Sequence, residues 1–363
     1  MTFKKTVAMY PNPPNVGILA NIQAYLRQAG YPAFRYRQLM QSLQQGIQNF
    51  DDMVELPKPI RKNLSTRFGP TPLPLKIATS QASKQVEKVL FETQLGARIE
   101  TVRSHYRAGW TSMCISSQAG CGLGCTFCAT GAMGLMKNLT CDEICAQVFH
   151  PYWQKQLPDS IAFMGMGEAL ANPDVFMAID TMIAKGHGGI SPRRLTVSTV
   201  GHAPNLEQLT QKHPQVNITL SVHSPFPEQR AQLIPLERKF PLAENLTILD
   251  RHVMNHHRKV YLAYLLIDHV NDTTDHLNAL IALVKRRCRP ELFHVNVIRY
   301  NTAFGADPSY RQPEASKVST FVEQLKAQGI HATRRTQFGE GIAAACGQLH
   351  AVTGSLISRQ KAK

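Results

Sequence analysis

From residue 160 onward, short apolar segments alternate with amphipathic ones, and this alternation constrains the fold more than any other feature of the chain. Repeated strand–helix units produce parallel strands joined by helical crossovers. The sequence therefore predicts an α/β fold with a full or partial barrel, whose function sits at the carboxyl ends of its strands. An open doubly wound sheet is the alternative. The expected strands are 160–167, 194–201, 216–224, 259–267, 292–300 and 331–337, and the helices between them include PDVFMAIDTMIAKG, NLTILDRHVMNHH, TDHLNALIALVKRR and SKVSTFVEQLKAQG.

The first 75 residues differ from this pattern. Residues 14–70 show helical spacing of apolar side chains, with Gly30 ending the first segment, and the proline-rich stretch 69–76 follows as a link. Next, VEKVLFET and ARIETVRSHY alternate as the two strands of a hairpin would. We expect a small helical accessory domain over residues 1–75, a core barrel over 76–355 and a basic tail over 356–363.

The charge balance points to an acidic partner. The chain carries 40 Lys and Arg against 25 Asp and Glu, a formal net charge of +15 with a pI near 9.6. Such an excess attracts nucleic acid or an anionic membrane. Charged residues make up only 18% of the chain, so it is not a disordered polyelectrolyte. The candidate phosphate contacts are Arg193 and Arg194, Lys285 to Arg287 with Arg289, Arg334 and Arg335, and in the accessory domain Arg35, Arg37, Arg61, Lys62 and Arg67.

The sequence gives no sign of export or membrane insertion. No apolar run follows the basic residues near the N-terminus, and no uninterrupted apolar stretch is long enough to span a bilayer. We therefore expect a cytoplasmic protein. Its eight cysteines should be mostly reduced there, so close cysteine spacing indicates metal or redox chemistry.

Cys121, Cys125 and Cys128 lie within the glycine-rich stretch GCGLGCTFCATG. Three thiolates can hold three irons of a [4Fe–4S] cluster, which leaves the fourth iron open to bind a substrate. The alternative is a structural zinc site, which needs a fourth ligand. Cys141, Cys145 or His150 could supply that ligand. The neighbouring glycines let the loop wrap a bulky cofactor, and the residues TCDE at 140–143 predict a capped helix directly after it.

The C-x-x-x-C-x-x-C spacing resembles the signature of radical S-adenosylmethionine enzymes. A longer set of stretches resembles the RlmN/Cfr group of ribosomal RNA adenine methyltransferases, closer to Cfr: RAGWTSMCISSQ, FMGMGEALAN, SPRRLTVSTVG, HSP, HVNVIRYN and AACGQL. The resemblance implies a partial radical SAM barrel with a [4Fe–4S] cluster and S-adenosylmethionine, whose cleavage yields a 5′-deoxyadenosyl radical. It also implies methylation of C8 of an adenosine in the peptidyl-transferase centre of 23S rRNA, which confers antibiotic resistance. The alternative is C2 methylation of the same base, as in RlmN, with tRNA as a possible second substrate.

The resemblance also assigns roles to single residues. Cys346 matches the cysteine that accepts a methyl group and then forms a covalent link to the RNA. Cys114 matches the cysteine that resolves this link by forming a disulfide with Cys346, and Glu100 matches a proton acceptor. Considered without the family, the two cysteines could be small buried hydrophobic residues, and Glu100 could be a surface charge on a strand.

The remaining matches concern the cofactor and partners. The residues that match cofactor contacts are Gly167, Glu168, Ser198, Ser221, Val222, His223 and Asn301. Glycines beside Glu168 would let the backbone approach the methionine moiety, and Glu168 could accept from its amino group. We expect a monomer that receives electrons from a partner such as flavodoxin. Cys141, Cys145 and Cys288 receive no role. Two alternative hypotheses are a zinc-stabilised RNA-binding module without catalysis and a radical enzyme acting on a small molecule.

Overall fold

The computed structural model describes residues 18–45, 47–153, 157–184, 188–336, 339–345, 347–349 and 351. Cys346 and the expected basic tail 356–363 lie outside the described residues, as does position 337 at the end of the last expected strand.

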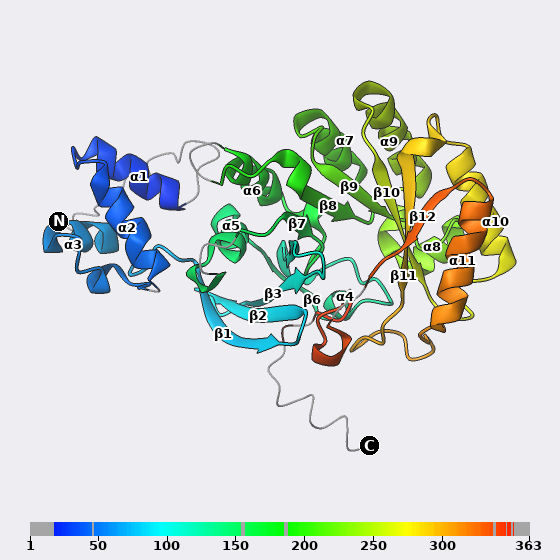
Figure 1. Ribbon diagram of the computed structural model, residues 1–363, viewed down its shortest axis with the longest axis horizontal. Helices are drawn as coiled ribbons and strands as arrows, with labels where there is room; N and C mark the ends of the chain where they lie inside the picture. The colour runs from blue at the N-terminus through cyan, green and yellow to red at the C-terminus, as the bar shows by residue number, and fades with distance from the viewer. Residues whose placement is uncertain are drawn as a thin grey trace, which may run out of the picture.

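Ten strands form one sheet in the described part of the chain, in the order β1 to β4 and then β7 to β12 (Figure 1). β1 to β4 pair antiparallel, and every neighbouring pair from β4 to β12 is parallel. All six strands expected from the strand–helix pattern are confirmed. The bounds are β1 Leu75–Ala82, β2 Val86–Thr93, β3 Arg98–His105, β4 Thr111–Ile115, β7 Ser160–Phe163, β8 Leu195–Thr199, β9 Asn217–Ser221, β10 Val260–Leu266, β11 Phe293–Arg299 and β12 His331–Arg334.

The strand order decides between the two α/β architectures. A doubly wound sheet reverses its strand order at a switch point, whereas here the parallel strands follow one another in chain order. Figure 1 shows α7, α9, α10 and α11 along the outer side of the curved sheet. The fold is therefore a partial barrel. The helices in this region are α5 Cys141–Phe149, α6 Asp174–Ile183, α7 Ala203–Lys212, α8 Pro227–Leu233, α9 Leu242–His256, α10 Thr274–Lys285 and α11 Ala315–Ala327.

The two faces of the parallel strands differ in character. On β8, Leu195 and Val197 are fully buried in the main hydrophobic core, while Ser198 on the opposite face is half-buried. β4 follows the same alternation, with Ile115 in the core and Cys114 half-buried. Side chains alternate between the two faces of a strand, so Cys114 and Ser198 project from the inner face of the barrel.

The N-terminal residues form three helices, α1 Ile18–Gln28, α2 Phe34–Gln44 and α3 Lys58–Phe68, as the spacing of apolar residues predicts. They share a hydrophobic cluster separate from that of the barrel. The backbone N–H of Ile18 donates to Asp142 on α5 at 2.7 Å, which connects this unit to the barrel. The cluster consists of Ile22, Leu26, Leu39, Leu43, Phe50, Met53, Leu56, Ile60, Leu64 and Leu73.

Two structural features extend beyond the sequence predictions. Residues 75–82, at the end of the expected proline-rich link, form β1 and add a strand to the predicted hairpin of β2 and β3. Residues 118–138 contain a second hairpin, β5 Gln118–Cys121 and β6 Gly134–Asn138, which encloses the three-cysteine loop.

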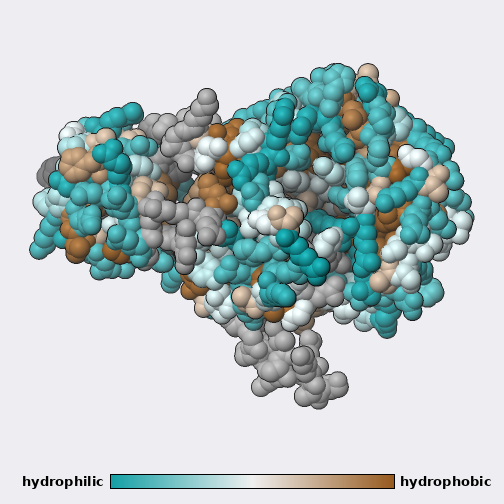
Figure 2. Space-filling view, viewed as in Figure 1, coloured by the Kyte–Doolittle hydropathy of each residue, from teal (hydrophilic) through white to brown (hydrophobic). Residues whose placement is uncertain are grey.

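The face seen in Figure 2 is largely hydrophilic, with hydrophobic side chains scattered over it. Among the residues that the structure describes, no helix combines the length and apolar character needed to cross a membrane.

Candidate active site

The three-cysteine loop is shaped by close backbone packing. Cys121 is the last residue of β5, and Cys128 is the N-cap of the short helix α4, Ala129–Ala132. The N–H of Cys128 donates to the carbonyl oxygen of Cys125 at 3.2 Å, which curls the loop. Gly120 has a φ of +73°, and a Cβ there would lie 1.9 Å from the carbonyl oxygen of Gly134. Only glycine can occupy that position beside the first cysteine.

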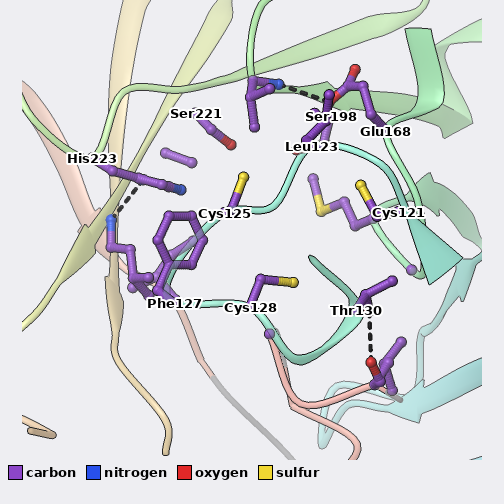
Figure 3. Close-up of a pocket in the computed structure, with 18 of the residues that line it drawn as sticks. Cys121, Leu123, Cys125, Phe127, Cys128, Thr130, Glu168, Ser198, Ser221 and His223 are labelled. Carbon is purple, nitrogen blue, oxygen red and sulfur yellow. Dashed lines mark hydrogen bonds between the residues drawn. The ribbon is translucent and has the colours of Figure 1, made fainter. Parts of the chain in front are cut away.

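All three cysteines line one pocket at the carboxyl ends of the parallel strands. Figure 3 shows their sulfur atoms around a common opening. Burial raises the pKa of the Cys121 thiol to about 11, and it raises the pKa of Cys125 as well; the nearby carboxylate of Glu168 adds to both effects. These thiols hold their protons at neutral pH until a metal centre displaces them. Buried thiols of this kind are not free reactive thiolates, and a metal centre would bind them by displacing their protons.

The fourth ligands considered for zinc lie elsewhere. On α5, the sulfur of Cys141 contacts the Thr181 hydroxyl at 3.6 Å, and that of Cys145 contacts the carbonyl oxygen of Ala178 at 3.8 Å. The ring of His150 packs against Phe91. Within the described ranges, no three His, Cys, Asp or Glu side chains are arranged to hold a single metal ion. The described part of the chain therefore offers no suitable set of ligands for a structural zinc site.

Glu168 forms the pocket wall where β7 ends. Burial raises the pKa of its carboxyl group, while hydrogen bonds from the Thr199 hydroxyl and from the N–H groups of Val200 and Leu170 act in the opposite direction. The last two bonds measure 3.0 and 3.1 Å. Four hydrogen-bond sites are available on a carboxylate, so Glu168 is held in place and can still accept from a ligand.

Close packing requires a glycine at position 167, whereas the sequence predicts a glycine there so that the backbone can approach a ligand. Its φ is +98°, and a Cβ there would lie 2.6 Å from the Cβ of Gln118. The Gln118 side chain in turn accepts from the N–H of Glu168 at 2.9 Å. The glycine therefore lets the β7 end pack against β5 and orients Glu168, although its backbone also lines the pocket.

His223 follows β9 and presents a defined hydrogen-bond donor to the pocket. Its Nδ1 accepts from the N–H of Leu265 at 3.1 Å, and its ring lies edge-on to Phe127. Burial lowers the pKa of His223 to about 3, with the positive charge of Arg230 acting in the same direction. The ring is therefore neutral at physiological pH. Because Nδ1 is the acceptor, Nε2 carries the proton and can donate to a ligand.

Asn301 has an unused donor at the end of β11. Its Oδ1 accepts from Gln312 at 3.1 Å, while its buried Nδ2 has no hydrogen-bond partner in the structure. A buried, unsatisfied amide is costly, and in a pocket it is typical of a ligand-binding group. Ser198 and Ser221 line the same pocket.

Arg230 on α8 supports this wall, and the sequence analysis did not identify it. It is 1% exposed and donates to the carbonyl oxygens of Val200, Ser221 and Val222 at 2.6, 2.7 and 3.0 Å. Its charge is balanced by an ion pair with the buried carboxylate of Glu237. Arg230 thus joins the carboxyl ends of β8 and β9. An arginine in the polar stretch PEQR carries no sequence signal of such burial.

The other expected site residues do not bring a described side chain into the pocket. Val222 does not bring its side chain to the pocket, because that side chain is fully buried in the main core. Glu100 and Cys114 do not line the pocket either; they lie on β3 and β4. Position 346 is outside the described residues, but Gly347 and Leu349 line the pocket beside the three-cysteine loop.

The basic runs lie on two different edges of the barrel. Arg193 and Arg194 precede β8, and residues 285–289 precede β11, so both runs lie at the amino ends of the parallel strands. The pocket is at the opposite edge. Arg335 follows β12, lines the pocket, and its guanidinium is 3.1 Å from the sulfur of Met164.

Comparison with known proteins agrees with this geometry. The sequence pattern of the Radical SAM superfamily matches residues 115–280. The "Ribosomal RNA large subunit methyltransferase Cfr" of Staphylococcus aureus is 47% identical over 331 residues, covering 91% of this chain and 95% of that protein. The protein of the same name from Shouchella clausii is 44% identical and covers 91% of this chain and 94% of its own.

This chain belongs to the RlmN/Cfr family of radical SAM methyltransferases. It is closer to Cfr. A solved structure, that of a radical SAM methyltransferase from Sphaerobacter thermophilus, superimposes with a TM-score of 0.83 at 34% identity and covers 93% of this chain and 98% of that one. The family membership confirms the fold class and the enzyme class expected from the sequence.

Radical SAM enzymes use a [4Fe–4S] cluster and S-adenosylmethionine. The residues present fit both groups. Three cysteines face one opening without a fourth beside them in the described residues. Glu168 supplies a carboxylate for a cationic ligand, while His223 and Asn301 supply donors for its polar atoms. Cys121, Cys125 and Cys128 would hold the cluster, and the ends of β7, β8, β9 and β11 would hold the S-adenosylmethionine.

Proposed function

We propose that this protein methylates C8 of an adenosine in the peptidyl-transferase centre of 23S rRNA. The observation that carries this proposal is that Gly347 and Leu349, next to Cys346, line the same pocket as the three cluster cysteines. A one-carbon unit held on Cys346 would be close to the radical source. The names of the Cfr relatives and the net charge of +15 support RNA as the substrate.

The chemistry of the target explains the choice of cofactor. C8 of adenine is an electron-poor amidine carbon and does not attack a methyl sulfonium as a nucleophile. The cluster and S-adenosylmethionine, when bound, supply the methyl group and a carbon radical. The chain must then hold the methyl carbon on a sulfur, and this is the role proposed for Cys346. Transfer of one hydrogen atom from this S-methyl group to the carbon radical would leave a methylene radical on the sulfur. Its addition to C8 would form the covalent bond between protein and RNA.

Cys114 and Glu100 would complete the reaction. Once the adduct has lost the ring proton and returned the one electron used to form the radical, the Cys114 thiolate would attack the sulfur of Cys346. The C–S bond would break with its electron pair on the released carbon, which takes up a proton to become the methyl group, and a disulfide would remain between the two cysteines. Glu100 takes the ring proton. Cys114 lies on the inner face of β4, directly opposite Val102 of β3, and Glu100 is two residues from Val102 on the same face of β3. Both side chains are therefore neighbours on one side of the sheet.

Further parts of the proposal follow from surface charge and chemistry. The accessory domain would contact RNA through exposed Arg37, Lys62 and Arg67. Base extrusion would bring the target adenosine to the pocket, since a stacked base is out of reach. We propose a cytoplasmic monomer reduced by a flavodoxin-type partner. C2 methylation, with tRNA as a further substrate, is the second candidate because it would use the same cysteines.

Trapping the covalent intermediate tests this function. Cys114→Ala, expressed in cells, should accumulate protein linked to RNA through Cys346, and the link should survive denaturing gel electrophoresis. Cys114→Ala/Cys346→Ala should carry no RNA. Cys288→Ala is the matched control, since Cys288 is an exposed cysteine that precedes β11 at the opposite edge of the barrel. RNA-free Cys114→Ala protein, alongside an active wild type, would contradict the mechanism.

A further inference from the structure

Lys88 and Glu100 form a buried ion pair between β2 and β3. Lys88 lies opposite Val102, and Glu100 lies opposite Leu90, so the two are diagonal neighbours on one face of the strand pair. The Lys88 Nζ is 2.9 Å from Glu100 Oε1, and the two side chains are only 7% and 3% exposed. Lysine is rarely buried to this degree unless its charge is matched. A buried pair pays a desolvation cost, which further hydrogen bonds must offset.

Those further bonds run to the C-terminal part of the chain. The Lys88 Nζ also donates to the carbonyl oxygen of Ala343 at 3.3 Å. The Oε2 of Glu100 accepts from the backbone N–H of Ala351 at 3.3 Å. The ion pair thus holds the chain at two points, one on each side of position 346.

The two residues held by the pair have unusual backbone conformations. Ala343 has a φ of +49° and Ala351 a φ of +52°, both in the left-handed region that residues with a Cβ rarely occupy. Such conformations persist where the surrounding contacts determine them. Both residues with strained backbones therefore make a contact with the ion pair.

Two described residues between these points are bonded to α4, the short helix that follows the third cysteine. The N–H of Ala129 donates to the carbonyl oxygen of Gly347 at 2.9 Å. The Thr130 hydroxyl donates to that of Leu349 at 2.6 Å, the bond drawn at Thr130 in Figure 3. Both donors belong to α4, which begins directly after Cys128. Among the described residues of this segment, 343 and 351 contact the ion pair, and 347 and 349 between them contact the helix after the third cysteine.

We propose that Lys88 is a positioning residue that, with Glu100, anchors the segment 343–351 against the three-cysteine loop. The purpose of this anchor rests on the proposed function. The anchor would hold the residues on both sides of Cys346 beside the inner face of the barrel, which carries Cys114. Lys88 also fixes the carboxylate of Glu100 on that face. The pair links strands that precede the three-cysteine loop to the segment proposed to carry the methyl group.

Hydrogen–deuterium exchange of the full-length, reconstituted protein tests the anchor without relying on catalysis. Lys88→Met keeps the length of the side chain but removes its charge and both contacts. Exchange of peptides spanning 343–351 should then rise at least tenfold, while peptides from β8 to β10 keep wild-type rates. Lys88→Arg should restore most of the protection. Unchanged exchange over 343–351 in Lys88→Met would overturn the proposal.

Two further variants separate anchoring from general destabilisation. Lys76→Met is the matched control, because Lys76 pairs with Glu92 on the neighbouring strands at 3.7 Å but is 70% exposed; it should leave exchange unchanged. Lys88→Met/Glu100→Gln removes the uncompensated charge, so stability should partly recover while fast exchange over 343–351 remains. Recovered protection in the double variant would show that the effect came from the unpaired charge and would overturn the anchor.

The activity readout then distinguishes this inference from the proposed function. Lys88→Met should keep the iron content and S-adenosylmethionine affinity of the wild type but lose at least tenfold in the turnover number for adenosine methylation. A wild-type protein that methylates no adenosine would refute the proposed function, whereas the exchange result would still decide the anchor. Wild-type turnover in Lys88→Met, with 343–351 released, would refute the positioning role.

Discussion

The carboxylate of Glu168 accepts a hydrogen bond from the backbone N–H of Val200 at 3.0 Å and thereby joins the ends of β7 and β8 at the wall of the pocket. The same carboxylate accepts from Leu170, two residues further along the chain. This edge of the pocket is thus held by a buried carboxyl group, which keeps hydrogen-bond capacity for a ligand.

Glu168→Gln tests this role with little change of shape. The amide keeps one acceptor but loses the charge that would hold an ammonium group. We expect the Kd for S-adenosylmethionine to rise about 10- to 100-fold, which corresponds to the roughly 1.5–3 kcal/mol of a charge-assisted hydrogen bond. Equilibrium dialysis with the reconstituted protein measures it. Asp159→Asn, at the opposite edge of the barrel, is the control, and equal affinities for both variants would refute the assignment.

Variants of the three proposed cluster ligands should differ sharply in iron content from variants of Cys141 and Cys145. Replacing Cys121, Cys125 or Cys128 by Ala removes one of three ligands, so we expect loss of most iron and sulfide after anaerobic reconstitution. Cys141→Ala and Cys145→Ala should retain full iron content, because those side chains lie on α5 against α6. Iron, sulfide and zinc analyses provide the measurement. Stoichiometric zinc without iron in the wild type would contradict this assignment and support a structural zinc site.

The buried pair of Arg230 and Glu237 should dominate the stability of the pocket wall. Arg230→Met leaves the Glu237 carboxylate buried and unpaired, which costs about 3–5 kcal/mol of unfolding free energy. Arg230→Met/Glu237→Gln should cost less than the single change, because no buried charge remains. Arg251→Met, in an exposed pair with Glu207, should cost less than about 1 kcal/mol. Urea unfolding measures all three; a double variant no more stable than Arg230→Met would contradict this interpretation.

Three buried histidines should make the fold sensitive to mild acid. Burial lowers the pKa of His150 and of His252 to about 4 and that of His223 to about 3. In the unfolded chain each has a pKa of about 6.5, so between these values the unfolded state binds more protons. Stability is therefore lost as pH falls below about 6.5, by up to roughly 1.4 kcal/mol per pH unit for each histidine. Urea unfolding from pH 7.5 to 5.5 checks this, and a flat profile would contradict it.

Periodicity was sufficient to predict the barrel, because strand and helix repeats are local signals. The six strands from 160 onward and the capping box at Thr140 are confirmed, the latter by reciprocal bonds between Thr140 and Glu143. The site edge was also predictable, since residues such as Glu168 and Ser221 fall at strand ends. Val222 directly follows Ser221, so the alternation of side chains places its side chain on the opposite face, in the main core.

The missed residues share a physical cause. Lys88 occurs in VEKVLFET, where a lysine in an alternating strand indicates a solvent-facing position; its partner Glu100 and its contact Ala343 are distant in sequence. Arg230 is similar, since its partners lie on β8 and β9. Burial of a charge depends on tertiary contacts, which neither composition nor spacing encodes.

The position of the new methyl group tests the central claim most directly. 23S rRNA isolated from cells expressing the wild type or Cys346→Ala is digested to nucleosides and analysed by mass spectrometry against standards of 8-methyladenosine and 2-methyladenosine. We predict 8-methyladenosine in 23S rRNA from the wild type and none from Cys346→Ala. Detection of 2-methyladenosine alone would contradict C8 methylation, and 8-methyladenosine formed by Cys346→Ala would contradict the cysteine carrier.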